Sequence, residues 1–155
     1  MQAKYGLVTP ETLQSMSGLE FLSGIASGRL PQPPIAETLG FRLVEVERGR
    51  AVFAGTPARG YLNPLGTIHG GYAGTLLDSC MACSVQTMLE RGNGYTTLEY
   101  KVHLVRPMTE ATGPVRAEGR VVHAGRRAAT AEGRITDDKG NVLAHGTTTC
   151  LVFPL

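Results

Sequence analysis

The sequence predicts a single α+β domain in which one long helix is wrapped by a curved antiparallel β-sheet. Apolar residues recur at helical spacing from about His69 to Leu89, and two alternating segments precede this helix while four follow it. A helix that is apolar on several sides needs wide cover, which a curved sheet provides. The 155 residues are enough for one core of ordinary size.

Residues 1–34 are predicted to form a helical extension outside the sheet domain, which spans residues 35–155. Thr9-Pro10 is typical of a helix start, and residues 17–20 (SGLE) fit a capping box that opens a second helix. The stretch LPQPP, residues 30–34, is predicted to end this helix and to form an extended connector. We expect the extension to pack against the domain as an appendage.

Six segments alternate between apolar and polar residues and are predicted as strands. The first two, residues 41–47 and 50–57, form a hairpin around Arg48-Gly49. The other four are predicted to follow the long helix as an antiparallel meander. They cover residues 95–107, 113–125, 127–138 and 141–153, with turns at Gly125 and at Asp138-Lys139-Gly140.

The composition excludes several classes of function. A formal net charge of +2, with no basic run and no interleaved aromatics, gives no reason to expect a nucleic-acid partner. No apolar stretch approaches the roughly 20 residues of a membrane helix, and no basic n-region precedes an apolar h-region. We therefore expect neither a membrane partner nor a secretory signal.

The cysteines and histidines show no ligand spacing for a metal. Three cysteines, an odd number, are expected to be small buried apolar residues in a reducing compartment, so we expect a cytoplasmic protein. Three isolated histidines are predicted to be surface or strand residues, and no metal is expected. These residues are Cys80, Cys83 and Cys150, and His103, His123 and His145.

The long helix begins in a way that helix propensity does not explain. In NPLGTIHGGYAGTLLDS, residues 63–79, each of the three helical glycines costs roughly 1 kcal/mol relative to alanine. Glycines at a helix N-terminus leave the backbone N–H groups accessible to an anion or a developing oxyanion. Residues four apart lie on one face of a helix, and one such stripe consists of Gly70, Gly74, Asp78, Ala82 and Gln86. The two glycines leave this stripe almost without side chains before the carboxylate of Asp78.

Asp78 is a carboxylate inside an otherwise apolar run, where an unpaired charge would be expensive. The N–H groups of Gly70 and Gly71 could stabilise a negative oxygen, while Asp78 acts as a nucleophile or general base at a carbonyl. Without such a role, Asp78 would act as a buried helix cap or form a hydrogen bond at an interface. Gly70 would then only allow a tight contact between the helix and a strand.

Gly70 and Asp78 lie too far apart to act on the same group within one chain. Their separation of eight residues corresponds to about 12 Å along the helix, so one carbonyl cannot touch both. Two antiparallel helices across a two-fold axis would bring the glycine end of one to Asp78 of the other. We therefore expect an obligate homodimer with two composite sites.

These motifs resemble a known family. The stretches NPLGTIHGG, LLDS, TTLEYKVHLVRP and LAHGT are similar to those of hotdog-fold thioesterases of the phenylacetate-pathway (PaaI-like) type, over roughly residues 35–152. The resemblance implies the hotdog fold and hydrolysis of acyl-coenzyme A thioesters by a dimer, commonly paired into a homotetramer. Coenzyme A is part of the substrate, and no separate cofactor is implied.

The resemblance also assigns roles to residues at the start of the helix. It implies that Asp78 is the catalytic carboxylate and that the Gly70 N–H donates to the thioester oxygen. Asn63 would help to place substrate or water, and His69 would lie beside the oxyanion. Taken alone, Asn63 is also an ordinary turn residue, and His69 is equally consistent with a helix cap.

Thr97 matches the position where the family often has a Ser or Thr that holds the attacking water. Thr96 takes this place if the register is shifted by one residue. The related branch that acts on hydroxybenzoyl thioesters has a glutamate at the acid position and a Thr one turn later. Asp78 and Ala82 stand at these positions here, as in the PaaI-like branch.

Further residues are candidates for substrate binding. Gly71 and Met81 are expected at the site, and Met81, Val85 and residues 61–65 would line a pocket at the dimer interface. Arginines near strand ends are natural partners for the phosphates of coenzyme A, although solvated strand-end charges are an equally good interpretation. The candidates are Arg106, Arg126 and Arg127.

Two other functions stay open. A hotdog dehydratase or hydratase needs a His paired with an acid, but His69 precedes Asp78 on the same helix and no Phe-Pro-rich loop is found. A non-catalytic acyl-CoA binding module is the other alternative. The first 30 residues are too short and too acidic for the helix-turn-helix of a regulator.

Overall fold

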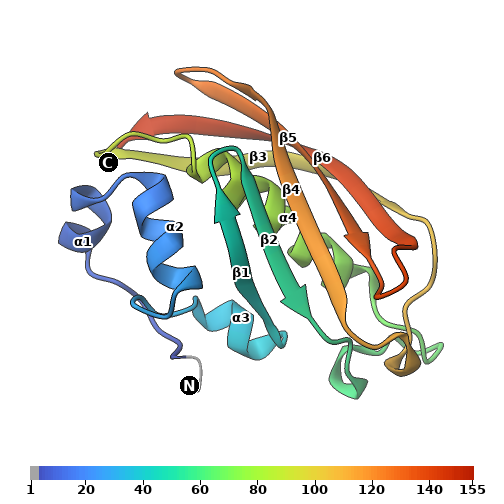
Figure 1. The fold of residues 1–155 in the computed structure, drawn as a ribbon. Coiled ribbons are helices and arrows are strands. Elements are labelled where there is room, and N and C mark those ends of the chain that lie inside the picture. Colours follow the sequence, from blue (N-terminus) through green and yellow to red (C-terminus); the bar gives the residue numbers. More distant parts are fainter. Residues whose placement is uncertain (1–3) are drawn as a thin grey trace.

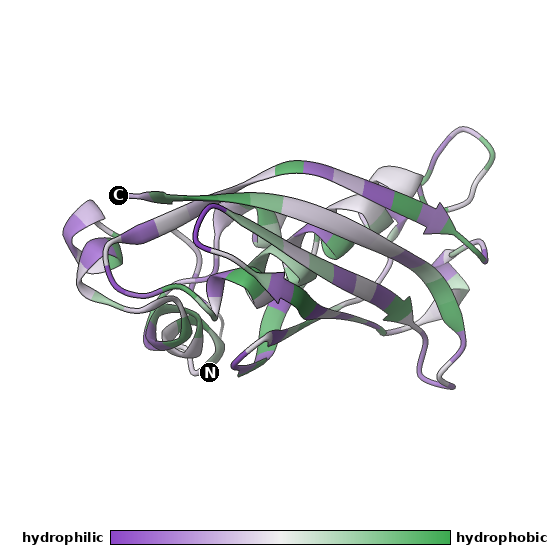
Figure 2. Ribbon diagram, turned by 90° about the horizontal axis from the view of Figure 1, so that it is seen from above, coloured by the Kyte–Doolittle hydropathy of each residue, from purple (hydrophilic) through white to green (hydrophobic). Residues whose placement is uncertain are grey.

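A computed structural model describes residues 4–155 and confirms the α+β architecture. A six-stranded antiparallel sheet curves around the long helix α4 (Gly70–Gln86), as Figure 1 shows. Hydrophilic and hydrophobic residues alternate along the strands, which separates an inner face from an outer one (Figure 2). The core lies between this inner face and α4, whose Leu76, Leu77, Cys80, Met81 and Val85 are fully buried.

The sheet differs from the predicted meander in the position of one strand. Of the four strands after the long helix, β4, β5 and β6 form a meander, while β3 pairs with β6 at the sheet edge and β2 pairs with β4, in the order β1-β2-β4-β5-β6-β3. Helix α4 carries the chain across the sheet from β2 to the far edge, where β3 begins. Both sides of β4 are occupied, by β2 and by β5, so β3 pairs with β6 instead. The strands are β1 (Phe41–Glu47), β2 (Arg50–Gly55), β3 (Asn93–Leu104), β4 (Val115–Ala124), β5 (Ala128–Thr136) and β6 (Val142–Pro154).

The N-terminal extension lies beside the β1 edge (Figure 1). Its helices α1 (Pro10–Ser15) and α2 (Gly18–Ala26) begin as predicted, with Thr9 as the cap of α1 and a complete capping box at α2. A third helix, α3 (Pro34–Thr38), replaces the end of the predicted extended connector. Two consecutive prolines were interpreted as a break, but Pro34 occupies the first turn, where its missing N–H costs nothing.

A buried glutamine fastens the extension to the sheet. Gln32 is only 6% exposed, and its amide donates to the Leu43 carbonyl at 3.1 Å while accepting from the Leu43 N–H at 3.0 Å. The backbone of Gln32 also bonds to Lys4 and Gly6, so the first described residues run alongside it. The connector therefore has a defined place against β1.

The capping box of α2 makes the extension sensitive to acid. The Ser17 N–H donates to the Glu20 carboxylate at 2.8 Å, and Arg91 donates to it at 2.9 Å. These bonds, the Ser17 N–H first, lower the pKa of Glu20 to about 2 from a usual value of 4.5. Because the folded pKa lies below the unfolded one, the stabilisation is complete above pH 4.5 and disappears as the pH falls toward 2.

We expect Glu20→Gln to lower the melting temperature slightly at pH 7 and to match the wild type near pH 2. Thermal unfolding at a series of pH values measures this difference. The control is Glu132→Gln on β5, because Glu132 makes no ion pair within residues 4–155. A difference between Glu20→Gln and wild type that stays constant down to pH 2 would contradict the assignment.

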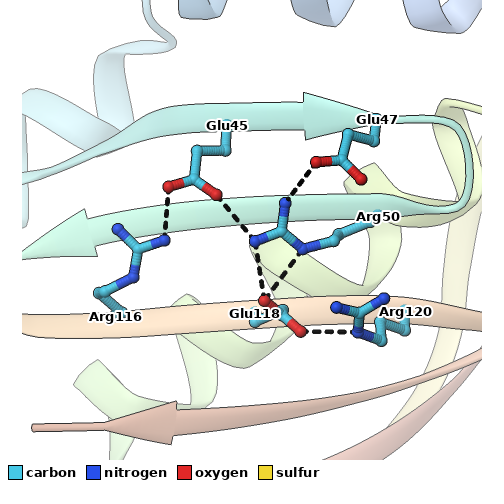
Figure 3. Close-up of polar contacts among 6 residues, drawn as sticks. All are labelled: Glu45, Glu47, Arg50, Arg116, Glu118 and Arg120. Carbon is cyan, nitrogen blue, oxygen red and sulfur yellow. Dashed lines mark hydrogen bonds and ion pairs between the residues drawn. The ribbon is translucent and has the colours of Figure 1, made fainter.

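A compensated ionic network covers the outer face of β1, β2 and β4 (Figure 3). The Arg50 guanidinium lies 2.7 Å from Glu45, 3.0 Å from Glu47 and 2.9 Å from Glu118. Arg116 and Arg120 bind the outer oxygens of Glu45 and Glu118 at 2.6 Å, and hydrogen bonds from Arg116 and then Arg50 lower the pKa of Glu45. Three carboxylates thus face three guanidinium groups, and the network ties the edge strand β1 to its neighbours.

Candidate functional site

Asp78 and Thr97 meet at the middle of α4. The Thr97 hydroxyl donates to the Asp78 carboxylate with an Oγ1–Oδ1 distance of 2.9 Å, and both side chains are partly buried. Thr96 is exposed and makes no side-chain hydrogen bond to Asp78, so the structure selects Thr97 of the two predicted alternatives. The pair joins the central helix to the edge strand of the sheet.

A β-bulge follows Thr97 in β3. Thr97 is opposite Cys150 and Glu99 is opposite Thr149, so Leu98 has no partner on β6 and its side chain is 60% exposed. Bulges bend a strand and redirect its side chains, and they are frequent beside functional sites. Such a shift of register cannot be read from alternation alone, which explains why Thr96 and Thr97 could not be separated from the sequence.

Two side chains beside the pair were not predicted. Cys83 follows Asp78 on α4, and Tyr95 precedes Thr97 by two residues on β3, hence on the same face of the strand. Burial raises the pKa of the Cys83 thiol to about 12, and the nearby Asp78 carboxylate contributes to the rise. The thiol is neutral at pH 7 and is a poor nucleophile. The two-residue period of β3 was the signal that could have identified Tyr95.

The first two helical N–H groups of α4 have different surroundings. His69 caps the helix, because its Nδ1 accepts from the Gly71 N–H at 2.9 Å. The expectation that Gly71 offers a second free N–H is therefore wrong. Gly70 N–H has no hydrogen-bond acceptor within residues 4–155, so of these two groups it is the one without a partner in the described chain.

The glycine stripe is in contact with β3 of the same chain. A Cβ on Gly70 would lie 2.8 Å from Leu104 Cδ1, and one on Gly74 would lie 3.5 Å from the Tyr100 hydroxyl. The stripe was predicted to let another group approach the helix backbone. Part of the space above Gly70 and Gly74 is instead occupied by the side chains of Leu104 and Tyr100. Gly70 and Asp78 are eight residues apart on α4, so the two do not meet within one chain.

Asn63 organises the loop before α4. Its Oδ1 accepts from the N–H groups of Leu65 and Thr67 at 2.9 and 3.2 Å, and its Nδ2 donates to the Thr67 hydroxyl at 2.8 Å. None of the Asn63 side-chain bonds described for residues 4–155 goes to Asp78 or Thr97. The geometry thus shows the turn-forming role of Asn63.

Met81, which was predicted to line a pocket at the dimer interface, is covered within the single chain. It is fully buried between α4 and the sheet, and a Cβ on Gly133 of β5 would lie 2.7 Å from Met81 Cγ. Position 81 faces the central strands β4 and β5, whereas Asp78 faces the edge strand β3. In a helix that is apolar nearly all round, the hydropathy pattern does not reveal which residues face the sheet.

The three candidate arginines lie at opposite ends of the domain. Arg126 and Arg127, in the β4–β5 turn, line a cleft of about 780 Å³ together with Val85, Met88 and Phe153. Arg106 follows β3 at the Gly70 end of α4, where its N–H donates to the Leu143 carbonyl. None of the three makes an ion pair with another residue in the range 4–155.

The histidines and other possible ligands form no metal centre in the part of the chain that the structure describes. Residues 4–155 contain no cluster of three or more His, Cys, Asp or Glu side chains that could hold a metal ion. In the same range, no helix is long and apolar enough to cross a membrane.

His103 and His145 were predicted to be isolated, but their rings stack with centroids 4.8 Å apart. They face each other because the two residues are opposite each other in the β3–β6 pair.

Comparison with known proteins points to one family. The model of the thioesterase superfamily matches residues 65–144, which include α4, Asp78 and Thr97. No curated protein matches the chain.

Solved structures agree with the family model. A phenylacetic acid degradation-related protein from Ralstonia eutropha JMP134 is 30% identical, with a TM-score of 0.76 over 84% of this chain and 98% of that one. A mutant of the phenylacetic acid degradation protein PaaI from Thermus thermophilus is 31% identical, with a TM-score of 0.68 over 76% and 97%. The Escherichia coli PaaI protein is 21% identical with a TM-score of 0.70 over 77% and 83%, and shows the shared fold.

Proposed function

Since the chain belongs to the thioesterase superfamily, as a hotdog thioesterase of the PaaI type, we propose that it hydrolyses acyl-coenzyme A thioesters to a carboxylic acid and free coenzyme A. The observation that carries the proposal is the 2.9 Å hydrogen bond between Thr97 and Asp78. It presents an oriented carboxylate within the family-matched segment. No metal or redox cofactor enters the proposed reaction.

Asp78 has the position and chemistry to activate a water molecule. The Thr97 hydroxyl donates a hydrogen bond to Asp78 Oδ1. The lone pairs of the hydroxyl oxygen are therefore available to accept a hydrogen bond from a water beside the carboxylate. The water oxygen attacks the thioester carbonyl carbon while Asp78 takes the proton, the carbon–sulfur bond breaks, and the proton passes to the leaving thiolate. Direct attack by Asp78, forming an anhydride that water then hydrolyses, uses the same carboxylate.

The proposed oxyanion donor is the Gly70 N–H of a partner subunit. Within one chain, Gly70 lies about 12 Å from Asp78 along the helix, so a second copy is needed to complete the site. The edge strand β3 supports a homodimer, because Leu98, Tyr100 and Leu104 are exposed along it and apolar edge strands are rarely left uncovered. Pairing of two such dimers into a homotetramer stays a prediction.

The dehydratase alternative has no support in the geometry. Its chemistry needs a histidine paired with a carboxylate, and within residues 4–155 the Asp78 carboxylate is hydrogen-bonded to Thr97 and to no histidine. The partner of Asp78 is a hydroxyl group, which suits the holding of water.

Release of free thiol from aromatic, short-chain and long-chain acyl-CoAs tests the proposed function. We expect the wild type to release coenzyme A from at least one of them. If none is hydrolysed while an acyl-CoA still raises the melting temperature, the hydrolase is excluded and the protein is an acyl-CoA binding module.

We expect Thr97→Val to lower kcat by about tenfold to a hundredfold, because a hydrogen bond to a charged group contributes roughly 1.5–3 kcal/mol. Steady-state hydrolysis of the preferred acyl-CoA measures this loss. Thr96→Val is the matched control, since Thr96 is the exposed neighbour on the same strand and has no bond to Asp78. Equal losses in both variants would show that Thr97 has no special role.

A further inference from the structure

An apolar cavity lies between the N-terminal extension and the sheet domain. Its volume is about 240 Å³, and its walls come from four parts of the chain: the extension, the β1–β2 hairpin, α4 and β3. The side chains that matter here are Phe21, Ile25, Leu43, Phe53, Cys83 and Tyr95. Among residues 4–155, no charged residue lines it.

The wall supplied by the extension has a fixed position. The backbone of Gly18 touches the backbone of Gln86, leaving no room for a Cβ, and the Gly18 N–H donates to the Leu89 carbonyl at 3.0 Å. Beyond the other end of α2, the Gln32 amide is bonded to the backbone of Leu43. The cavity is therefore formed in advance of ligand binding.

Two walls of the cavity come from the elements that carry the Asp78–Thr97 pair. Cys83 lies five residues after Asp78 on α4, and Tyr95 lies two residues before Thr97 on the same face of β3. The hydrogen bond between Thr97 and Asp78 joins these same two elements, so the carboxylate and the cavity lie between the same helix and strand.

We propose that this cavity binds the acyl group of the thioester, and that the N-terminal extension thereby selects apolar, uncharged acyl groups of about six to eight carbons. The inference rests on the proposed thioesterase function. Its volume of about 240 Å³ is roughly eight times the ~30 Å³ share of one water, and a methylene group has a similar size.

The lining also predicts which acyl groups are rejected. An acetyl group would leave most of the apolar wall unfilled, and so would gain little from it. An acyl group with a terminal carboxylate would bring an unpaired charge against a wholly uncharged set of described lining residues, which is unfavourable. We expect kcat/KM for hexanoyl-CoA to exceed that for acetyl-CoA and for hexanedioyl-CoA at least tenfold.

Phe21→Trp tests the cavity by filling it. Phe21 is only partly buried, so a larger ring can be accommodated without dismantling the core. We expect kcat/KM for hexanoyl-CoA and octanoyl-CoA to fall at least tenfold relative to kcat/KM for acetyl-CoA. The matched control is Tyr5→Trp, which enlarges an aromatic ring of the same extension that does not line the cavity.

A second variant acts in the opposite direction. Phe21→Ala enlarges the cavity and is expected to move the preferred chain length upward, toward decanoyl-CoA. If both Phe21 variants fold with wild-type melting temperatures and change all chain lengths equally, or none, the acyl group binds elsewhere and the proposal is overturned.

Binding separates this proposal from the proposed function. If the wild type hydrolyses no acyl-CoA, the thioesterase function fails, and calorimetry with S-hexyl-CoA and with coenzyme A still tests the cavity. At least tenfold tighter binding of S-hexyl-CoA than of coenzyme A, lost in Phe21→Trp, would support the cavity. Equal affinities, or a preference that Phe21→Trp leaves unchanged, would overturn it.

Discussion

Asp78→Asn is expected to lower kcat for the preferred acyl-CoA by about 10²–10⁴-fold, the range typical of a lost general base. Asparagine has the size of aspartate, and its carbonyl oxygen can still accept the Thr97 hydrogen bond seen at 2.9 Å. It cannot take a proton from water or attack a thioester. The loss is therefore expected in kcat, while KM stays within about threefold because the substrate contacts are kept.

The measurement is steady-state release of coenzyme A thiol, with the melting temperature of each variant determined in parallel. Ser79→Ala is the control, since Ser79 is the adjacent residue of α4 and makes no side-chain hydrogen bond within residues 4–155. Ser79→Ala should keep wild-type kcat. If Asp78→Asn keeps more than a tenth of the wild-type kcat, Asp78 is a structural partner of Thr97 and the proposed mechanism is wrong.

Local signals predicted the long helix, the two helices before it and the six strands, whereas the arrangement of the strands depends on non-local contacts. The capping box at Ser17 and the glycine turn of the first hairpin act within a few residues, and both are found where predicted. The position of β3 beside β6 depends on where α4 delivers the chain, and no local pattern encodes this. The short helix α3 was missed because prolines end helices as readily as they begin them.

The same division holds for the site. Asp78 could be proposed as a site residue because a carboxylate in an apolar helix is a local anomaly, whereas the position of Met81 depends on which side of α4 faces the central strands. The difference between Gly70 and Gly71 comes from one hydrogen bond to His69. The cavity has walls from four separated segments, so only the folded structure brings it into view.

Gly119→Ala is expected to destabilise the protein by about 3 kcal/mol or more, at or above the upper end of the range for overpacked cores. Gly119 lies on β4 directly under α4, where an added Cβ would be 2.6 Å from the Met81 nitrogen and closer still to the Cys80 carbonyl group. These neighbours are backbone atoms. They can move only if the helix itself moves away from the sheet.

Thermal unfolding measures the effect, and a chain of this length should lose roughly 6–12 °C in melting temperature. Gly60→Ala is the matched control, because a Cβ there meets no atom within 4 Å and Gly60 has no positive φ; its melting temperature should stay close to that of the wild type. Asp78 is only two residues from Cys80, so a helix displaced at Gly119 also shifts the carboxylate relative to Thr97. Gly119→Ala is therefore expected to lose kcat as well as stability, and full activity with an unchanged melting temperature would mean that α4 does not rest on β4.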